Sequence, residues 1–241
     1  MTPNVVVLLS VAVAVVLRQD KSKHFPLNLM LNQVSSKKLA YFQAGKVFGR
    51  PGLVAGVDEV GRGALFGPVV AAAIVIPTKS WEELVQIGVR DSKKLSAKRR
   101  LELAQEIQRL SLSWSIAWAS RKEIDRFNIF QASLLAMKRA VVKLKPQPVI
   151  CLVDGKHQLP FLGIPQKNLV KGDERSLIIA AASILAKVWR DRLILRFAQK
   201  YPQYGLATNK GYGTKQHCLA LQQYGPTSQH RMSFRPCRVD N

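Results

Sequence analysis

Short apolar runs alternate with longer amphipathic segments along most of the chain. The short runs are rich in Val, Ile and Ala, as buried strands are, and the longer segments repeat apolar residues at helical spacing. We expect strands over residues 53–57, 69–76, 112–119 and 148–155, and helices over residues 97–110, 124–144, 177–199 and 218–224. Residues 78–87 have no clear pattern. Strands that alternate with helices predict an α/β fold built on one sheet.

Acidic residues stand where the apolar runs stop. Asp58 and Glu59 follow the first run, Asp154 lies near the end of another, and Asp173 precedes the long helix. Ligands of open α/β sheets collect at strand ends, so these acids are expected to meet there. No His or Cys occupies a comparable position, and oxygen ligands alone favour Mg²⁺ or Mn²⁺. Asp58 and Glu59 can share such a site only if the strand twists or bulges at its end, because neighbouring side chains point to opposite faces.

The acids also have ordinary structural interpretations, which the pattern alone leaves open. Asp58 and Glu59 could cap a hairpin, since Asp is common in turns. Asp173 could be the N-cap of the helix that follows it.

Three further features could contact a ligand. Gly61, Arg62 and Gly63 suit a sharp turn whose backbone a ligand can approach closely. Lys93 and Lys94 precede a helix and are either a solvated surface or a phosphate contact. Tyr212, between two glycines, is either half-buried or free to stack on a sugar or base.

Net charge is the feature of the composition that restricts which binding partners are expected. The chain has 241 residues, of which 37 are Lys or Arg and 15 are Asp or Glu, giving a formal net charge of +22. Such a charge favours a polyanionic partner, nucleic acid before an anionic membrane surface. The 3 cysteines form no C-x-x-C pair, which argues against a disulfide framework or a zinc knuckle and fits a reducing cytoplasm. Four acids at strand ends then predict metal-dependent phosphodiester hydrolysis.

The first fifty residues differ from the remainder. Residues 5–17 are apolar but too short for a membrane span of about 20 residues, and no basic residue precedes them as in a secretory signal. We consider three interpretations of residues 5–17, in descending order of preference: a non-essential extension, a weak membrane-associating segment and a signal peptide. Residues 18–50 are a loosely ordered basic arm. We expect a monomeric cytoplasmic protein without stable membrane association.

Several motifs occur together and in one order. They are DEVGRG (58–63), GPVVAAA (67–73), DSKKLS (91–96), VDG (153–155), KGD (171–173), AAASILAKVWRD (180–191), KGYGT (210–214) and HRMSF (230–234). Together they resemble bacterial ribonuclease HII. The resemblance implies a ribonuclease H-like fold, with a mixed central sheet flanked by helices and a C-terminal helical region.

The resemblance also implies an activity and a site. The activity is endonucleolytic cleavage of RNA in RNA–DNA hybrids and 5′ to single ribonucleotides in duplex DNA, leaving 5′-phosphate and 3′-hydroxyl ends. By motif match, the metal ligands are Asp58, Glu59 and Asp154, the fourth catalytic carboxylate is Asp173, and the substrate contacts are Gly61, Arg62, Gly63 and Tyr212. We also expect Lys93 and Lys94, the basic residues before a helix described above, to bind the substrate. The glycine turn would sense the ribose 2′-OH, and Tyr212 would pack on the deoxyribose after the RNA-to-DNA junction.

The resemblance sets an expected division of the chain and leaves two departures. We expect an extension over residues 1–50, a catalytic core over 51–200 and a substrate-contacting region over 201–241. Asn209 stands where the family commonly has His, and the extension has no counterpart in compact members. The alternatives are a non-catalytic basic RNA-binding protein, which would not need the acids, and another nuclease or recombinase of this fold.

Overall fold

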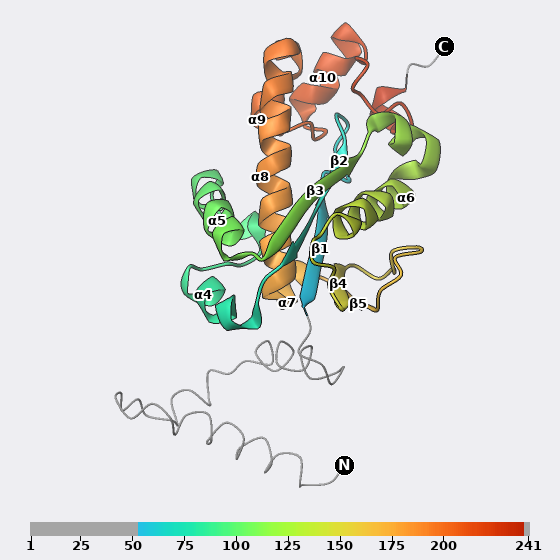
Figure 1. Ribbon diagram of the computed structural model, residues 1–241. Coiled ribbons are helices and arrows are strands. Elements are labelled where there is room, and N and C mark those ends of the chain that lie inside the picture. Colours follow the sequence, from blue (N-terminus) through green and yellow to red (C-terminus); the bar gives the residue numbers. More distant parts are fainter. Residues whose placement is uncertain (1–52, 239–241) are drawn as a thin grey trace, which may run out of the picture. The chain divides into compact units, whose positions relative to one another are not determined.

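The computed structural model describes residues 53–238 (Figure 1). The predictions for the extension over residues 1–50 therefore lie outside the described residues. No helix within residues 53–238 combines the length and the apolar character that crossing a bilayer requires.

Five strands form one mixed sheet in the order β3-β2-β1-β4-β5. They are β1 (Val54–Val60), β2 (Val69–Val75), β3 (Ser113–Ala119), β4 (Ile150–Asp154) and β5 (Gln166–Leu169). The pairs β1–β2 and β2–β3 are antiparallel, whereas β1–β4 and β4–β5 are parallel. This arrangement confirms the expected α/β fold with a mixed central sheet.

The strand β1 is longer than its apolar run. We expected it to end at Val57, but it continues through Asp58 and Glu59 to Val60. Asp58 pairs with Ala72 and Glu59 with Ala71, and the register with β2 contains no bulge. The strand continues because β2 supplies backbone partners whatever the side chains are. The expected strand end was wrong, and the hairpin-cap interpretation is excluded.

Helices cover both faces of the sheet (Figure 1). The helices α5 (Ala97–Leu110) and α8 (Leu177–Lys200) lie on one face, and α6 (Arg121–Val142) lies on the other. The helix α8 approaches β1 so closely that a methyl group on Gly56 would lie 2.6 Å from the backbone of Ile178. The small residues at the start of α8 are buried in this contact, as their size predicts.

Two features of α6 differ from the prediction of a continuous helix over 124–144. Ser120 and Glu123 form a capping box that starts the helix at Arg121. Asn128 has a non-helical backbone, with φ of 66°, and its Oδ1 accepts a hydrogen bond from the backbone N–H of Gln131 at 3.0 Å. Asn128 therefore interrupts the helix and caps its second part.

The remaining elements are short. They are α4 (Trp81–Gln86), α7 (Gly172–Arg175), α9 (Leu206–Asn209), α10 (Lys215–Tyr224) and the 3₁₀ turns η1 (Thr78–Ser80), η2 (Ser92–Lys94), η3 (Pro202–Tyr204) and η4 (Arg235–Cys237). The helix α4 lies in the stretch where no clear pattern was seen. The helix α10 begins before the expected residue 218, because Thr214 caps it by accepting from the N–H of His217.

The C-terminal region packs on the connection between β1 and β2. Leu65 and Phe66 of that connection join a core cluster with residues of α8, α9 and α10. Isolated bridges pair Ala64 with Tyr212 and Phe66 with His230. The C-terminal region thus lies beside the turn that follows Asp58 and Glu59.

Candidate active site

Three carboxylates meet where β1 and β4 cease to pair. The last paired residues are Val57 and Val153, and Asp58 and Asp154 follow them directly. One carboxylate oxygen from each of Asp58, Glu59 and Asp154 lies within 4.8 Å of the other two. The Asp58 Oδ1 also accepts a hydrogen bond from the backbone N–H of Glu59 at 2.7 Å, which holds the Asp58 carboxyl beside the next residue. Three of the four predicted acids therefore form one cluster.

Burial makes this cluster electrostatically unfavourable without a cation. Only 5% of Asp58 is exposed, and burial, followed by the charges of Glu59 and Asp154, raises the pKa of its carboxyl well above the ordinary value. Burial likewise raises the pKa values of Glu59 and Asp154. An ion pair with Arg62 at 3.2 Å partly offsets the shift at Glu59.

The cluster fits a divalent cation. The Glu59 Oε2 is buried and has no hydrogen-bond partner in the described part of the chain. A buried carboxylate oxygen without a partner is costly, and a bound cation would satisfy it. Only oxygen ligands are present, which suits a hard ion such as Mg²⁺ or Mn²⁺. No other trio of His, Cys, Asp or Glu within residues 53–238 has ligand atoms this close together.

Asp173 lies next to the cluster without joining it. The backbone N–H of Gly172 donates to Asp154 Oδ1 at 2.6 Å, so the first residue of α7 holds Asp154 in place. Asp173 follows Gly172, is 7% exposed, and its charge adds to the raised pKa of Asp154. The N-cap of α8 is Ser176, so the interpretation of Asp173 as the cap of that helix was wrong.

The two predicted lysines differ in their surroundings. The Lys93 Nζ donates to Asp173 Oδ2 at 2.9 Å, and this hydrogen bond raises the pKa of Lys93. The turn η2 that carries both lysines is tied to α8 by a 3.0 Å hydrogen bond between the hydroxyls of Ser92 and Ser183. Lys94 is exposed and forms no ion pair within residues 53–238. Lys93 is therefore part of the acidic site, whereas Lys94 lies at its rim.

A buried arginine orients the glycine turn. The guanidinium of Arg231, which has no exposed surface, donates to the carbonyls of Gly61 at 2.7 Å, Arg62 at 2.8 Å and Gly67 at 2.9 Å. In a trans peptide the N–H points away from the C=O, so the N–H groups of Arg62 and Gly63 point away from Arg231. Neither N–H donates to an acceptor in the described chain. The turn therefore presents two unused backbone donors.

A second buried arginine joins the tyrosine loop to the same turn. Arg190, also without exposed surface, donates to the carbonyls of Phe66 at 3.0 Å, Pro68 at 3.3 Å and Lys210 at 2.9 Å. Its guanidinium lies 5.5 Å from the ring centroid of Tyr212, which is half-buried. The backbone N–H of Leu65 donates to the carbonyl of Gly211 at 2.8 Å. The predicted tyrosine and glycine contacts are thus neighbours.

Sequence reasoning assigned no role to Arg190 or Arg231. One signal for Arg190 was available, because it lies four residues after Ala186 and four before Ile194, on the buried side of α8. Arg231 lies outside regular structure, so no periodicity marks it as buried. Asn209, the departure noted above, is buried, donates to the Tyr204 carbonyl and accepts from the N–H of Gly211, each at 2.7 Å. Its side chain therefore braces the tyrosine loop.

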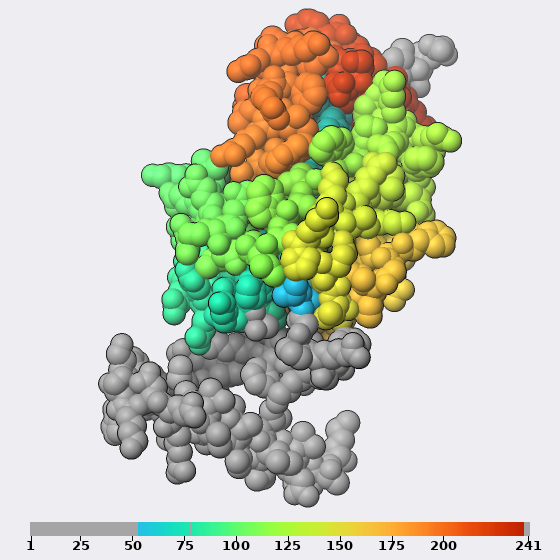
Figure 2. All heavy atoms as spheres, in the orientation of Figure 1, coloured from blue at the N-terminus to red at the C-terminus, as the bar shows by residue number. Residues whose placement is uncertain are grey.

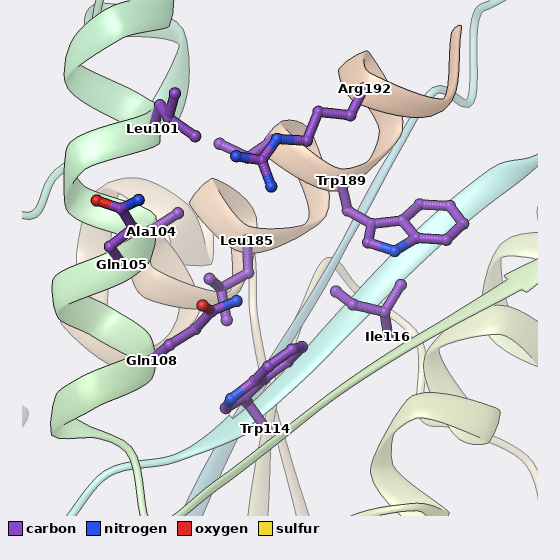
Figure 3. Close-up of a pocket in the computed structure, with 10 residues that line it drawn as sticks. Leu101, Ala104, Gln105, Gln108, Trp114, Ile116, Leu185, Trp189 and Arg192 are labelled. Atoms are coloured by element: carbon purple, nitrogen blue, oxygen red, sulfur yellow. The ribbon is translucent and has the colours of Figure 1, made fainter. Parts of the chain in front are cut away.

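Hollows in the surface differ in their chemistry. A hollow of about 40 Å³ is lined by Glu59, Arg62 and Asp154. A hollow of about 170 Å³ lies between α5, α8 and β3, where Leu101, Trp114 and other side chains face one another (Figure 3). A larger one, of about 740 Å³, lies between α8, the start of α6 and the C-terminal segment, on the face seen in Figure 2. No carboxylate lines the last two, so neither competes with the cluster as a cation site.

Known proteins provide a comparison for this arrangement. The family described as Ribonuclease HII matches residues 55–237. Ribonuclease HII of Trichormus variabilis is 60% identical over 188 residues, which cover 78% of this chain and 84% of that protein. The Ribonuclease HII of Synechocystis sp. is 54% identical over 185 residues, covering 77% and 96%. The crystal structure of ribonuclease H2 from Pyrococcus horikoshii matches with a TM-score of 0.68 at 29% identity, covering 77% of this chain and 95% of that one.

Proposed function

This chain belongs to the ribonuclease HII family of metal-dependent endoribonucleases, and we propose that it cuts the RNA strand of RNA–DNA hybrids. We propose further that it cuts duplex DNA on the 5′ side of a single embedded ribonucleotide, leaving a 5′-phosphate and a 3′-hydroxyl. The observation that carries this proposal is the buried cluster of Asp58, Glu59 and Asp154 in a chain of net charge +22. An acidic pocket repels phosphate unless cations lie between them.

The cluster would hold the cations, and the surrounding residues would fix its shape. Asp58, Glu59 and Asp154 would be the ligands, with Asp173 as the fourth carboxylate beside them. Two Mg²⁺ or Mn²⁺ ions bound there would supply the positive charge that activates water and stabilises the leaving 3′-oxygen. Gly172 keeps Asp154 oriented through its N–H, and Lys93 keeps Asp173 in place.

The glycine turn would distinguish ribose from deoxyribose. The two sugars differ locally only in the 2′-OH, which can accept and donate a hydrogen bond. The free N–H groups of Arg62 and Gly63 are donors on the exposed side of the turn, and no side chain at Gly63 blocks the approach. The turn is held rigid by Arg231, so the donors are oriented before the substrate binds.

The rim would bind the remainder of the duplex. Tyr212 lies beside the turn and would pack on the deoxyribose that follows the ribonucleotide. Lys94, exposed and without an ion pair in the described chain, would contact a phosphate. A non-catalytic RNA-binding protein would gain nothing from burying three carboxylates at a cost in folding free energy.

Cleavage of defined duplexes tests this function. The substrates are an end-labelled DNA duplex with one ribonucleotide, a uniform RNA–DNA hybrid and an all-DNA duplex, each with Mg²⁺, Mn²⁺ or EDTA. We expect cleavage of the first two only with a divalent metal, and none of the all-DNA duplex. Asp58→Asn should abolish cleavage and leave binding of the duplex largely intact. Metal-independent cleavage, or unchanged turnover by Asp58→Asn, would contradict the proposal.

A further inference from the structure

Two buried imidazoles face each other behind the tyrosine loop. His217 lies in α10 and His230 in the C-terminal segment, and neither has exposed surface. Their Nε2 atoms are 3.1 Å apart, which is a hydrogen-bond distance. Aromatic rings surround the pair, with Tyr204 contacting both imidazoles and Phe66 contacting His230. No carboxylate within residues 53–238 hydrogen-bonds either ring.

The hydrogen bonds of the two Nδ1 atoms determine which ring nitrogens carry the protons. The backbone N–H of Thr227 donates to His230 Nδ1 at 2.9 Å, and a backbone N–H can only donate. His230 must therefore carry its proton on Nε2 and donate it to His217 Nε2. His217 in turn must carry its proton on Nδ1, which donates to the Tyr212 carbonyl at 2.9 Å. The chain of hydrogen bonds has one direction, and both rings are neutral.

We propose that His230 fixes the tautomer of His217, so that the Nδ1–H of His217 positions the Tyr212 loop and thereby sets the preference for a ribonucleotide followed by DNA; we call this histidine pair the relay. The inference rests on the proposed function of Tyr212. Both histidines are positioning residues, because they are fully buried and neither belongs to the carboxylate cluster. The relay connects α10 and the C-terminal segment to the one carbonyl of Tyr212, which also accepts from the N–H of Thr214 at 2.8 Å.

The surroundings keep the relay neutral. Burial lowers the pKa of His217, and burial together with the facing His217 lowers the pKa of His230 to about 4. The titratable neighbour Tyr204 donates its hydroxyl to the Gly225 carbonyl at 2.6 Å and so supplies no charge to the pair. The adjacent Arg231 directs its guanidinium to the glycine turn. A second proton on His217 would place N–H against N–H between the rings, and a second proton on His230 would face the backbone N–H of Thr227, so the relay forms only when both rings are neutral.

Two near-isosteric variants separate the relay from simple packing. In His217→Asn the side-chain amide takes the place of Nδ1 and can still donate to Tyr212. In His217→Gln the amide takes the place of Nε2 and reaches His230 but not the carbonyl. We expect His217→Gln to lower kcat/KM for the embedded ribonucleotide about three- to tenfold relative to the uniform hybrid, the effect of one hydrogen bond. His217→Asn should change this ratio less than twofold, although it leaves the larger void and loses the contact with His230, because an amide NH₂ is a donor even without a partner that fixes its tautomer.

The tautomers provide a readout that is independent of cleavage. In ¹⁵N spectra of the full-length protein, we expect His217 protonated on Nδ1 and His230 on Nε2, with His230 gaining no second proton between pH 8 and pH 5.5 and His217 titrating below its ordinary pKa. Titration of either ring near the ordinary pKa of about 6.5, or the opposite tautomers, would overturn the relay. So would equal effects of the two His217 variants.

Tyr212→Ala distinguishes failure of the relay from failure of the proposed function. If Tyr212→Ala lowers the ratio of embedded-ribonucleotide to uniform-hybrid cleavage and His217→Gln does not, the relay is refuted and the role of Tyr212 stands. If Tyr212→Ala leaves the ratio unchanged, the proposed role of Tyr212 fails, and the inference built on it fails with it. A loss in both Tyr212→Ala and His217→Gln, with the ratio retained in His217→Asn, supports the relay.

Discussion

Gly61 and Gly63 occupy the same turn, and the structure predicts opposite consequences for the same substitution. Gly61 has φ of +89°, a conformation that costs a non-glycine residue about 1–3 kcal/mol. A methyl group there would lie 2.2 Å from Arg190 Nε, so the guanidinium would have to move away from the three carbonyls it binds. With part of those charged hydrogen bonds lost, Gly61→Ala should destabilise the protein by about 3–6 kcal/mol.

Gly63 has no such constraint. Nothing in the described chain lies within 4 Å of a methyl group at Gly63, and its φ is not positive. Gly63→Ala should therefore leave stability unchanged or raise it by about 0.4–1 kcal/mol. The methyl group would instead crowd a ligand at the exposed N–H groups. We expect kcat/KM for an embedded ribonucleotide to fall by up to about tenfold, the effect of losing one hydrogen bond.

Urea unfolding and cleavage kinetics, measured on the same preparations, check the two effects. A lower unfolding midpoint for Gly61→Ala beside an unchanged or higher midpoint for Gly63→Ala would confirm the steric argument. Equal midpoints for the two variants would refute it. A Gly63→Ala enzyme that cuts the embedded ribonucleotide at the wild-type rate would refute the close approach of the substrate to this backbone.

Three further predictions follow from the site and its surroundings. Asp58→Asn removes a buried charge that Glu59 and Asp154 repel, so it should raise the melting temperature in EDTA; a lower value would contradict the electrostatic argument. Tyr212→Ala should impair cleavage at an RNA-to-DNA junction more than cleavage of a long hybrid, and an equal loss of kcat/KM on both would contradict a role of Tyr212 in recognising the junction. Glu123, whose pKa is lowered to about 2 mainly by its hydrogen bond to Arg139, stabilises the fold above pH 4.5. That stabilisation should disappear as the pH falls from 4.5 towards 2, so the unfolding midpoints of wild type and Glu123→Gln should converge; a constant difference would refute the assignment.

The chain itself carries the information for the sheet and for the identity of the site. Apolar runs beginning at Leu53 and Val69 predict two central strands, and the small residues of 180–182 predict a helix packed closely on the sheet. Such patterns can be recognised in the sequence because the buried face of a helix or a strand requires apolar residues at a regular spacing. The family can also be recognised from the sequence, because each motif is a short continuous segment and the motifs occur in a fixed order. Element ends were less accurate, as at Glu59 and Ser120, because strand pairing and capping depend on neighbours.

Contacts between distant segments could not be read from any local pattern. The convergence of Asp58 with Asp154 required the parallel pairing of β1 and β4, and the roles of Arg190 and Arg231 required the C-terminal region to fold onto the glycine turn. The sequence alone determined which residues can ligate a metal or line a turn, because side-chain chemistry and short-range periodicity are properties of the chain. Only the tertiary structure decided which of them share a site and which carbonyls a buried guanidinium holds, because those depend on distances between residues far apart in sequence.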